Sequence, residues 1–434
     1  MSEQMLVAVS GCVAVLALML IRVPIAISLA SVAVAGFAYL VGPGPALGIL
    51  IDSPIRTVTN FNFSVIPMFV LMGALVAASG MSRELFRAAN AWVGHLPGGM
   101  AMATILACGG FASINGSSVA SAATMTHVAL PEMRRAGNDP GLSAGVIAAG
   151  GTLGIMIPPS VMFILYAVLT DTDVVSLFIA GIVPGLMAIV MYCITVQIIF
   201  LLRPEWLPRG SRADRKEKLA SLRAIWATGL LFALVMGGIY FGVVTITEAA
   251  GLGVFGALII GVARGRLPWS AVEESLIEAL RTSAAIFFIL IAAFLFQYFL
   301  AVSQLSQLLG EALESLPVGP IGVVIAILAF YIIVGMFVDE LAIMLLTIPI
   351  VFPIVVNLGF DPVWFGVLVV VTIQIGLIAP PVGIVCFIIN NMVPDIGIVN
   401  IYRGAMPFVI ADLVWLALLV AFPSLSLYLG RLMN

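Results

Sequence analysis

Two strongly apolar segments, residues 151–168 and 371–389, each contain a pair of adjacent prolines, and these pairs constrain the fold most. Proline has no amide hydrogen and its ring clashes with the preceding helical turn, so neither segment forms one continuous helix. In hydrocarbon, unwound backbone is tolerated only where it is buried in protein or lines a wet cavity. The two breaks therefore mark candidate binding positions.

The two segments indicate an internal duplication. At an offset of 222 residues, the separation of Pro158 from Pro380, further positions match: Pro131 with Pro353, Gly137 with Gly359, Asp139 with Asp361, Pro140 with Pro362, Gly154 with Gly376, and Pro159 with Pro381. With one further residue of slippage, Gly181 and Pro184 match Gly404 and Pro407. Glycine and proline are common in membrane helices, but chance rarely keeps so many in phase.

The composition is that of a membrane protein with many spans. Hydrophobic residues make up 62% of the 434 residues and charged residues only 9%, far from the usage of soluble domains. The chain has no basic block interleaved with aromatic residues, so nothing points to nucleic acid. The four cysteines all lie in apolar segments without metal-ligand spacing, which predicts core positions: Cys12, Cys108, Cys193 and Cys386.

A full helical span needs about 20 apolar residues. This rule predicts spans near 5–21, 23–41, 62–80, 174–202, 224–242, 245–263, 282–302 and 405–429. The first is interpreted as a span and not a signal peptide, because it lacks a basic start and a cleavage site. Residues 42–62 are too broken to cross, and residues 82–95 and 265–281 are amphipathic connectors expected at the membrane interface.

Two further apolar runs, residues 99–131 and 318–353, are interrupted near their centres. Their halves are too short to cross comfortably, so each run predicts a re-entrant helical hairpin whose tip reaches the middle of the membrane. The tips are residues 113–118 and 335–342. Each hairpin precedes a broken helix, at 140–170 in the first half and at 361–392 in the second.

The repeats are predicted to be inverted. A polar cytoplasmic linker, residues 206–222, divides the chain into repeats 1–205 and 223–434. Threading the spans with this linker in the cytoplasm puts every Lys and Arg except Arg56 and Arg431 on the cytoplasmic side, as the positive-inside rule requires. The fold class is then an all-α polytopic membrane protein with inverted repeats, the architecture of secondary transporters.

The hairpin tips and helix breaks carry the candidate ion sites, because free N–H groups there attract anions and free carbonyls coordinate hard cations. In the first half, neutral oxygens suit Na⁺ better than a divalent ion. The predicted Na⁺-binding residues are Ser113, Asn115, Gly116, Ser117, Ser118, Gly154, Ile155, Pro158, Gly335, Asp339, Thr372, Gly376 and Pro380. The alternatives are that the small residues only allow close helix packing, and that Asp339 caps the returning helix or reaches water.

Catalysis is not predicted. The chain offers no activated nucleophile and no phosphate-binding loop, so it is not an enzyme, and energy must come from an ion gradient or a partner. His95 and His127 lack neighbours with metal-ligand spacing and are interpreted as packing or interface residues. Glu248 is expected at the outer edge of the membrane, and Glu340 shares the second tip with Asp339.

Four stretches together resemble the large membrane subunit of tripartite ATP-independent periplasmic (TRAP) transporters: FASINGSSVASAATMTHVALPEMRRAG, GGTLGIMIPPS, GMFVDELAIMLLTIPI and IGLIAPPVG. The resemblance covers essentially the whole chain. It implies an elevator-type ion-transporter fold in a bacterial inner membrane and Na⁺-driven uptake of an organic acid. It also implies a small four-span membrane subunit, not fused to this chain, and a periplasmic binding protein that delivers the substrate.

The resemblance places the substrate between the two tips. The substrate-binding residues are then Ser117, Ser118, Thr152, Pro159, Asp339 and Pro381. No Lys or Arg lies at this depth in the threading, so helix N-termini, hydroxyls or bound Na⁺ would hold a carboxylate. The open alternatives are a stand-alone sodium/dicarboxylate symporter, an intramembrane enzyme using Asp339, and a channel.

Overall fold

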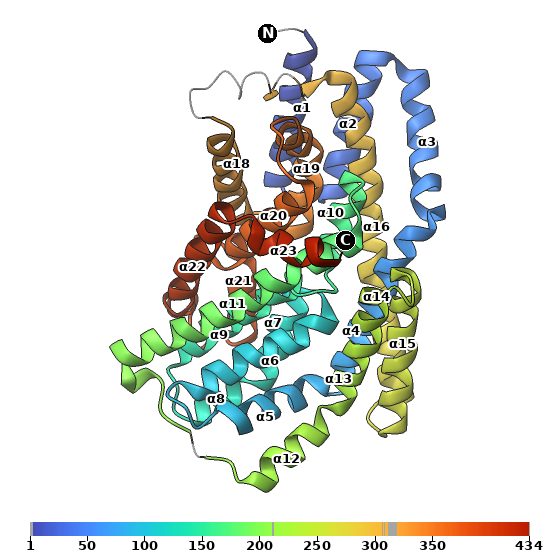
Figure 1. Cartoon of the computed structure of the whole chain (residues 1–434). Coiled ribbons are helices and arrows are strands. Elements are labelled where there is room, and N and C mark those ends of the chain that lie inside the picture. Colours follow the sequence, from blue (N-terminus) through green and yellow to red (C-terminus); the bar gives the residue numbers. More distant parts are fainter. Residues whose placement is uncertain (1–2, 211, 306, 308, 311–318, 434) are drawn as a thin grey trace.

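The protein is described by a computed structural model covering residues 3–210, 212–305, 307, 309–310 and 319–433 (Figure 1). The described residues form helices and connecting loops, without strands. The first half contains α1 (Glu3–Leu20), α2 (Ile25–Val41), α3 (Pro43–Thr59), α4 (Val65–Ala78), α5 (Met81–Val93), α6 (Gly99–Asn115), α7 (Ser118–Val128), α8 (Leu130–Arg135), α9 (Pro140–Thr152), α10 (Val161–Thr170) and α11 (Val174–Leu202).

The second half begins within the polar linker. It contains α12 (Arg215–Ala224), α13 (Trp226–Phe232), α14 (Gly238–Tyr240), α15 (Ile246–Ala263), α16 (Trp269–Ser303), α18 (Gly319–Gly335), α19 (Glu340–Asn357), α20 (Pro362–Ile378), α21 (Ile384–Met392), α22 (Ile398–Ala421) and α23 (Ser424–Met433). A π-helical segment, Ala233–Gly237, joins α13 to α14.

Six described helical segments are long and apolar enough to cross a membrane, and a seventh counts if the bent pair Arg215–Ala224 and Trp226–Tyr240 is one span. The six are Phe61–Ala78, α11, α15, α16, α19 and α22. The apolar parts of α1 and α2 are shorter. The prediction of an all-α membrane protein with many spans is confirmed.

The connector at 265–281 and the end of the last span differ from the sequence prediction. Residues 265–281 and 282–302 were expected to be a connector and a span, but α16 runs from Trp269 to Ser303 without a break, because it contains no glycine or proline. Residues 42–62, predicted to be too broken to cross, contain α3 with Pro54 inside it, and α3 is not among the segments found long and apolar enough to span. The last span ends earlier than predicted, at Ala421, just before Pro423.

Both hairpins and both broken helices are present. The first hairpin is α6 and α7 with its tip at Gly116 and Ser117, and the second is α18 and α19 with its tip at residues 336–339. Residue 318, the predicted start of the second hairpin, lies outside the described residues. The first break separates α9 from α10, and the second separates α20 from α21. The inverted relation of the two repeats stays a prediction.

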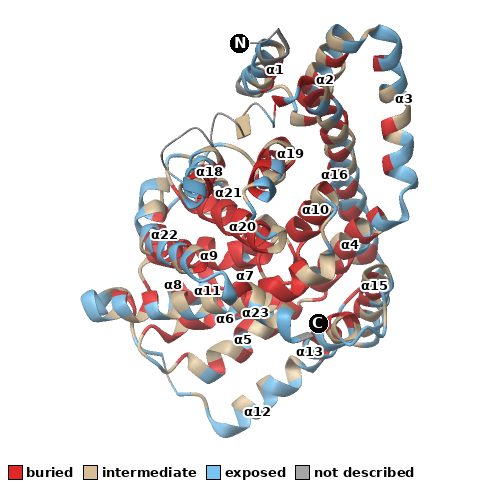
Figure 2. Ribbon diagram, turned by 45° about the horizontal axis from the view of Figure 1, so that its top comes forward, coloured by how far each residue is buried: buried red, intermediate tan, exposed pale blue. Residues whose placement is uncertain are grey.

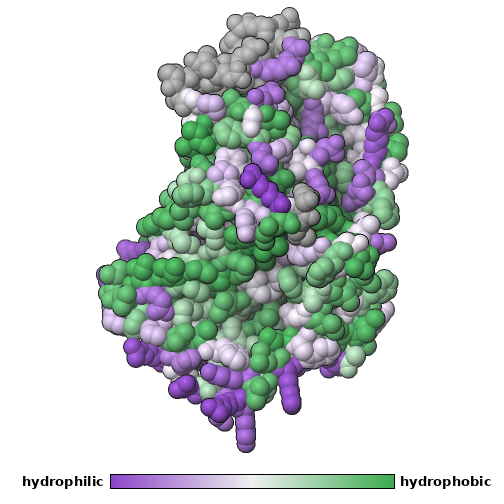
Figure 3. Space-filling model, in the orientation of Figure 1, coloured by the Kyte–Doolittle hydropathy of each residue, from purple (hydrophilic) through white to green (hydrophobic). Residues whose placement is uncertain are grey.

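The helices form a packed centre with less buried helices around it. Figure 2 shows buried residues concentrated along α20 and the helices around it, whereas α3 and α12 are mostly exposed or intermediate. The long helix α16 packs against α2, α3 and α4 along one side. Figure 3 shows hydrophilic residues gathered at the lower end of the molecule, below a broad hydrophobic surface.

The closest helix packing joins the two repeats. A Cβ atom on Gly145 of α9 would lie 2.1 Å from the carbonyl carbon of Gly404 of α22. A Cβ atom on Gly404 would in turn lie 2.1 Å from the carbonyl oxygen of Gly141. Glycines therefore let the two backbones touch, as small residues do between membrane helices.

Replacing Gly404 by alanine should destabilise the protein by about 1–3 kcal/mol, because the added methyl group meets backbone that does not rotate away. Thermal unfolding of the purified protein measures the effect. Gly48→Ala on α3 is the matched control, because nothing lies within 4 Å of its added methyl group. An unchanged midpoint for Gly404→Ala would contradict the packing described here.

Candidate functional site

The first hairpin tip packs directly on the first helix break. A Cβ atom on Gly154 would lie 2.6 Å from the carbonyl oxygen of Ser117, and one on Gly116 would lie 2.9 Å from the carbonyl oxygen of Pro159. Asn115 ends α6, and its side-chain amide donates to the hydroxyl of Ser121 at 3.2 Å. Backbone carbonyls and side-chain oxygens of the tip therefore meet the unwound backbone of the break.

The second tip packs on the second break in the same way. A Cβ atom on Gly376 would lie 2.6 Å from the carbonyl carbon of Gly335, the last residue of α18. The amide of Gly383, just past the break, donates to the carbonyl oxygen of Met336 at 3.1 Å. Gly154 and Gly376, which match at the 222-residue offset, thus have the same role in the two halves.

The two tips also touch each other. The hydroxyl of Ser118 donates to Oε2 of Glu340 at 2.5 Å, and both residues are buried. Each is the first residue of the returning helix of its hairpin, and the two are 222 residues apart. A contact between equivalent residues is what a twofold relation between repeats produces.

Several predicted site residues take local roles. Asp339 caps α19 by accepting a hydrogen bond from the amide of Leu341 at 3.1 Å, which is the alternative that the sequence left open. The hydroxyls of Ser113 and Thr372 donate to carbonyls of their own helices. Ile155 accepts a hydrogen bond at its carbonyl from Ser160. Pro381 is exposed, and its carbonyl accepts from Tyr402 at 2.8 Å.

A cavity of about 300 Å³ opens between the tips and the long helices. Asn115, Gly116 and Ser117 line it from the first tip, and Glu340 lines it from the second. Ala74 of α4 and Glu278 of α16 belong to its opposite side. Its lining contains no Lys, Arg or His, so cations there would have to come from solution.

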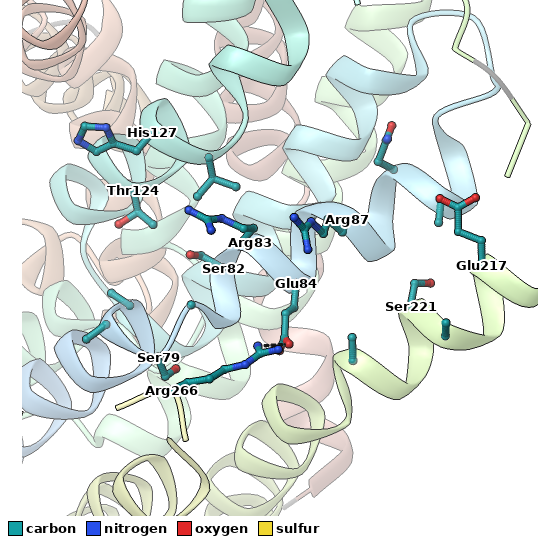
Figure 4. Close-up of a pocket in the computed structure, with 18 residues that line it drawn as sticks. Ser79, Ser82, Arg83, Glu84, Arg87, Thr124, His127, Glu217, Ser221 and Arg266 are labelled. Carbon is teal, nitrogen blue, oxygen red and sulfur yellow. Dashed lines mark hydrogen bonds and ion pairs between the residues drawn. The ribbon is translucent and has the colours of Figure 1, made fainter. Parts of the chain in front are cut away.

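A larger cavity of about 910 Å³ shares Ala77 and Thr124 with the first (Figure 4). Arg83 and Arg87 lie next to each other on α5 and have no ion-pair partner among the residues that the structure describes. His127 reaches the same cavity from α7. By contrast, Arg264 and Arg266 both pair with the buried carboxylate of Glu84.

Sequence reasoning missed a buried polar cluster behind the breaks. The hydroxyl of Tyr192 donates to Oδ2 of Asp412 at 3.0 Å and accepts from the amide of Gln374 at 2.9 Å. Thr152, predicted to face substrate, is fully buried, and its hydroxyl donates to the carbonyl of Ala149 in its own helix at 2.7 Å. Asp412 in an apolar span was a signal that could have found the cluster.

The fold and the site define a multi-pass membrane protein of the transporter type, with two hairpin tips meeting two broken helices. Residues 12–425 match the family described as the tripartite ATP-independent periplasmic transporter, DctM component. The chain belongs to this family. The resemblance noted from the sequence motifs is confirmed, and the members named below are permeases, not enzymes.

Relatives extend over most of the chain. The C4-dicarboxylate TRAP transporter large permease protein DctM of Pseudomonas aeruginosa is 36% identical, covering 89% of this chain and 93% of that protein. The sialic acid TRAP transporter large permease protein SiaM of Vibrio cholerae is 30% identical over 86% of this chain and 87% of its own. The isethionate TRAP transporter permease protein DctMQ of Oleidesulfovibrio alaskensis is 32% identical, covering 94% of this chain and 64% of that protein.

One solved structure supports the fold. The crystal structure of the YdaH transporter of Alcanivorax borkumensis matches with a TM-score of 0.62 and 16% identity. The match covers 88% of this chain and 89% of that chain. At this identity the likeness concerns the fold alone.

Replacing Ser118 by alanine should destabilise the protein by about 1.5–3 kcal/mol, because the buried carboxylate of Glu340 would lose its hydrogen bond. Thermal unfolding checks this. Ser10→Ala is the control, because Ser10 is exposed and bonds only within its own helix, to the carbonyl of Val7. Equal unfolding midpoints for the two variants would mean that the bond between the tips contributes nothing.

Proposed function

We propose that this chain is the transport subunit of a Na⁺-coupled importer of an organic acid in a bacterial inner membrane. A periplasmic binding protein delivers the substrate, and a small four-span subunit completes the membrane part. The substrate occupies the 300 Å³ cavity between the tips. The hairpins and broken helices move together as an elevator against the long helices.

The observation that carries the proposal is that each hairpin tip contacts the helix break of its own half. Gly154 and Gly376 let the tip backbones approach the broken helices closely, and the tips join through Ser118 and Glu340. Free carbonyls and neutral side-chain oxygens suit Na⁺. Because the cavity lining has no basic side chain, Na⁺ bound at the tips would supply the positive charge that a carboxylate needs.

The names of the relatives support an acidic substrate and a small subunit. They include transporters of C4-dicarboxylates, sialic acid and isethionate, all of which are anions. The isethionate relative is longer, since this chain spans 64% of it, which leaves room for a small subunit on the same chain. A stand-alone sodium/dicarboxylate symporter is the second candidate, and it would work without a binding protein.

The test is uptake of labelled organic acids into proteoliposomes that contain this chain and its small subunit. We expect uptake to need both an inward Na⁺ gradient and the binding protein. Uptake without the binding protein would identify a stand-alone symporter. Uptake that does not depend on the Na⁺ gradient would contradict Na⁺ binding at the tips.

Replacing Asp339 by asparagine should weaken the Na⁺ dependence of uptake while the chain stays folded. Asparagine still accepts the capping bond from Leu341 but lacks the charge that attracts a cation. The measurement is the Na⁺ concentration for half-maximal uptake, which we expect to rise about tenfold, roughly 1.4 kcal/mol of lost attraction. Asp361→Asn, at the cap of α20, is the control because it makes the same change at an exposed helix start. An equal response in the two variants would contradict a Na⁺ role for Asp339.

The 910 Å³ cavity offers a route for the anion between the tips and the aqueous phase. Arg83 and Arg87 are unpaired cations in its wall, and such a lining concentrates anions by electrostatic focusing. Replacing both by glutamine should slow uptake several-fold at low salt and less at high salt, where the field is screened. Arg215→Gln, on the exposed start of α12, is the control. A salt-independent effect would mean that the two arginines do not guide the anion.

A further inference from the structure

Four helices meet around the phenol oxygen of Tyr192, in the buried cluster behind the two helix breaks. Tyr192 comes from α11, Asp412 from α22, Gln374 from α20 and Thr152 from the end of α9. Thr152 and Gln374 occupy the same position in the two repeats, since they are 222 residues apart. The phenol oxygen is hydrogen-bonded to the second broken helix through Gln374, whereas the hydroxyl of Thr152 donates within the first.

Two oxygens of this cluster lack partners. Oδ1 of Asp412 and Oε1 of Gln374 are buried and accept no hydrogen bond from any described residue. Both side chains are fully buried. A buried acceptor without a donor is destabilising, and more so when it is charged. Tyr192 supplies no second donor, because its single hydroxyl hydrogen goes to Oδ2 of Asp412.

Among the residues that the structure describes, none that carries a positive charge packs near the carboxyl group of Asp412. The helices that pack against α22 are α9, α11, α20 and α21. Their ionisable side chains are Tyr192 and Cys193 on α11 and Cys386 on α21, while α9 and α20 have none. On α22 itself, Tyr402 and the exposed Arg403 lie at the far end, and Arg403 is about 13 Å along the helix axis from Asp412. A carboxylate at Asp412 would be a buried charge without compensation, which proteins avoid.

We propose that Asp412 is a proton-binding site, with the proton on Oδ1 and the resulting O–H group donating to Oε1 of Gln374. One proton removes the charge and satisfies both unpartnered oxygens. The carboxyl group takes up this proton from water. The hydrogen bonds then form a ring, in which Asp412 donates to Gln374, Gln374 donates to Tyr192, and Tyr192 donates to Asp412.

The site is distinct from the Na⁺ positions proposed at the tips and does not depend on them. The tips contribute backbone carbonyls, whereas this cluster consists of side chains from α11, α20 and α22. Because the bonded ring includes Tyr192 and Gln374, the proton fixes the second broken helix against α11 and α22.

Infrared absorption of the purified full chain and its Asp412→Asn variant tests the proposal. A protonated carboxyl group absorbs in the carbonyl region, apart from carboxylate bands, so we expect the difference spectrum to show a band lost in the variant. Asp171→Asn is the matched control, because Asp171 is exposed and in the left-handed conformation that asparagine also adopts. This control should leave the band unchanged. A wild-type spectrum without a band assignable to Asp412 would overturn the proposal.

Thermal unfolding of the same variants supplies a second readout. Asparagine has an N–H donor where the protonated carboxyl has O–H, so Asp412→Asn should keep the unfolding midpoint. Asp412→Ala, which leaves Tyr192 and Gln374 unpaired, should lower it by several degrees. If both variants unfold alike and both lose stabilisation by added NaCl relative to choline chloride, the carboxylate binds Na⁺ and the proton assignment is wrong.

Discussion

The unwound backbone at the two Pro-Pro positions is the constraint on which the rest of the structure depends. Neither break can be left facing lipid, because unpaired amides and carbonyls are costly in hydrocarbon. The hairpin tips cover the breaks, and the contact is possible only because Gly154 and Gly376 lack side chains. This packing also brings carbonyl oxygens together at two points, which are therefore candidate ion sites.

The glycines and prolines made this arrangement predictable. The adjacent prolines predicted both breaks, because proline interrupts a helix, and the phase of glycines and prolines indicated the duplication. The interrupted apolar runs predicted both hairpins, because their halves are too short to cross. Composition predicted the membrane class through its high hydrophobic and low charged content. The continuous helix α16 was missed because amphipathic and apolar stretches were treated as separate elements, although no helix breaker lies between them.

Side-chain partners were less predictable, since they depend on which residues of different helices meet. The sequence favoured Asp339 over Glu340 at the second tip, yet Glu340 lines the cavity and accepts the hydrogen bond from the other tip. Asp412 was missed, although it is an acid in an apolar span. Its neighbours Tyr192 and Gln374 lie far away in the sequence, so only the fold brings them together.

The duplication preserves the backbone while the chemistry of the two halves diverges. Glycine and proline recur in phase at several matched positions, such as Gly154 and Gly376, whereas Ser118 matches Glu340 and Thr152 matches Gln374. The hydroxyl group of Ser118 donates to the carboxylate of Glu340. Two identical carboxylates meeting at such a contact would repel each other in a medium of low dielectric constant. The divergence therefore lets the equivalent residues Ser118 and Glu340 bond to each other across the interface between repeats.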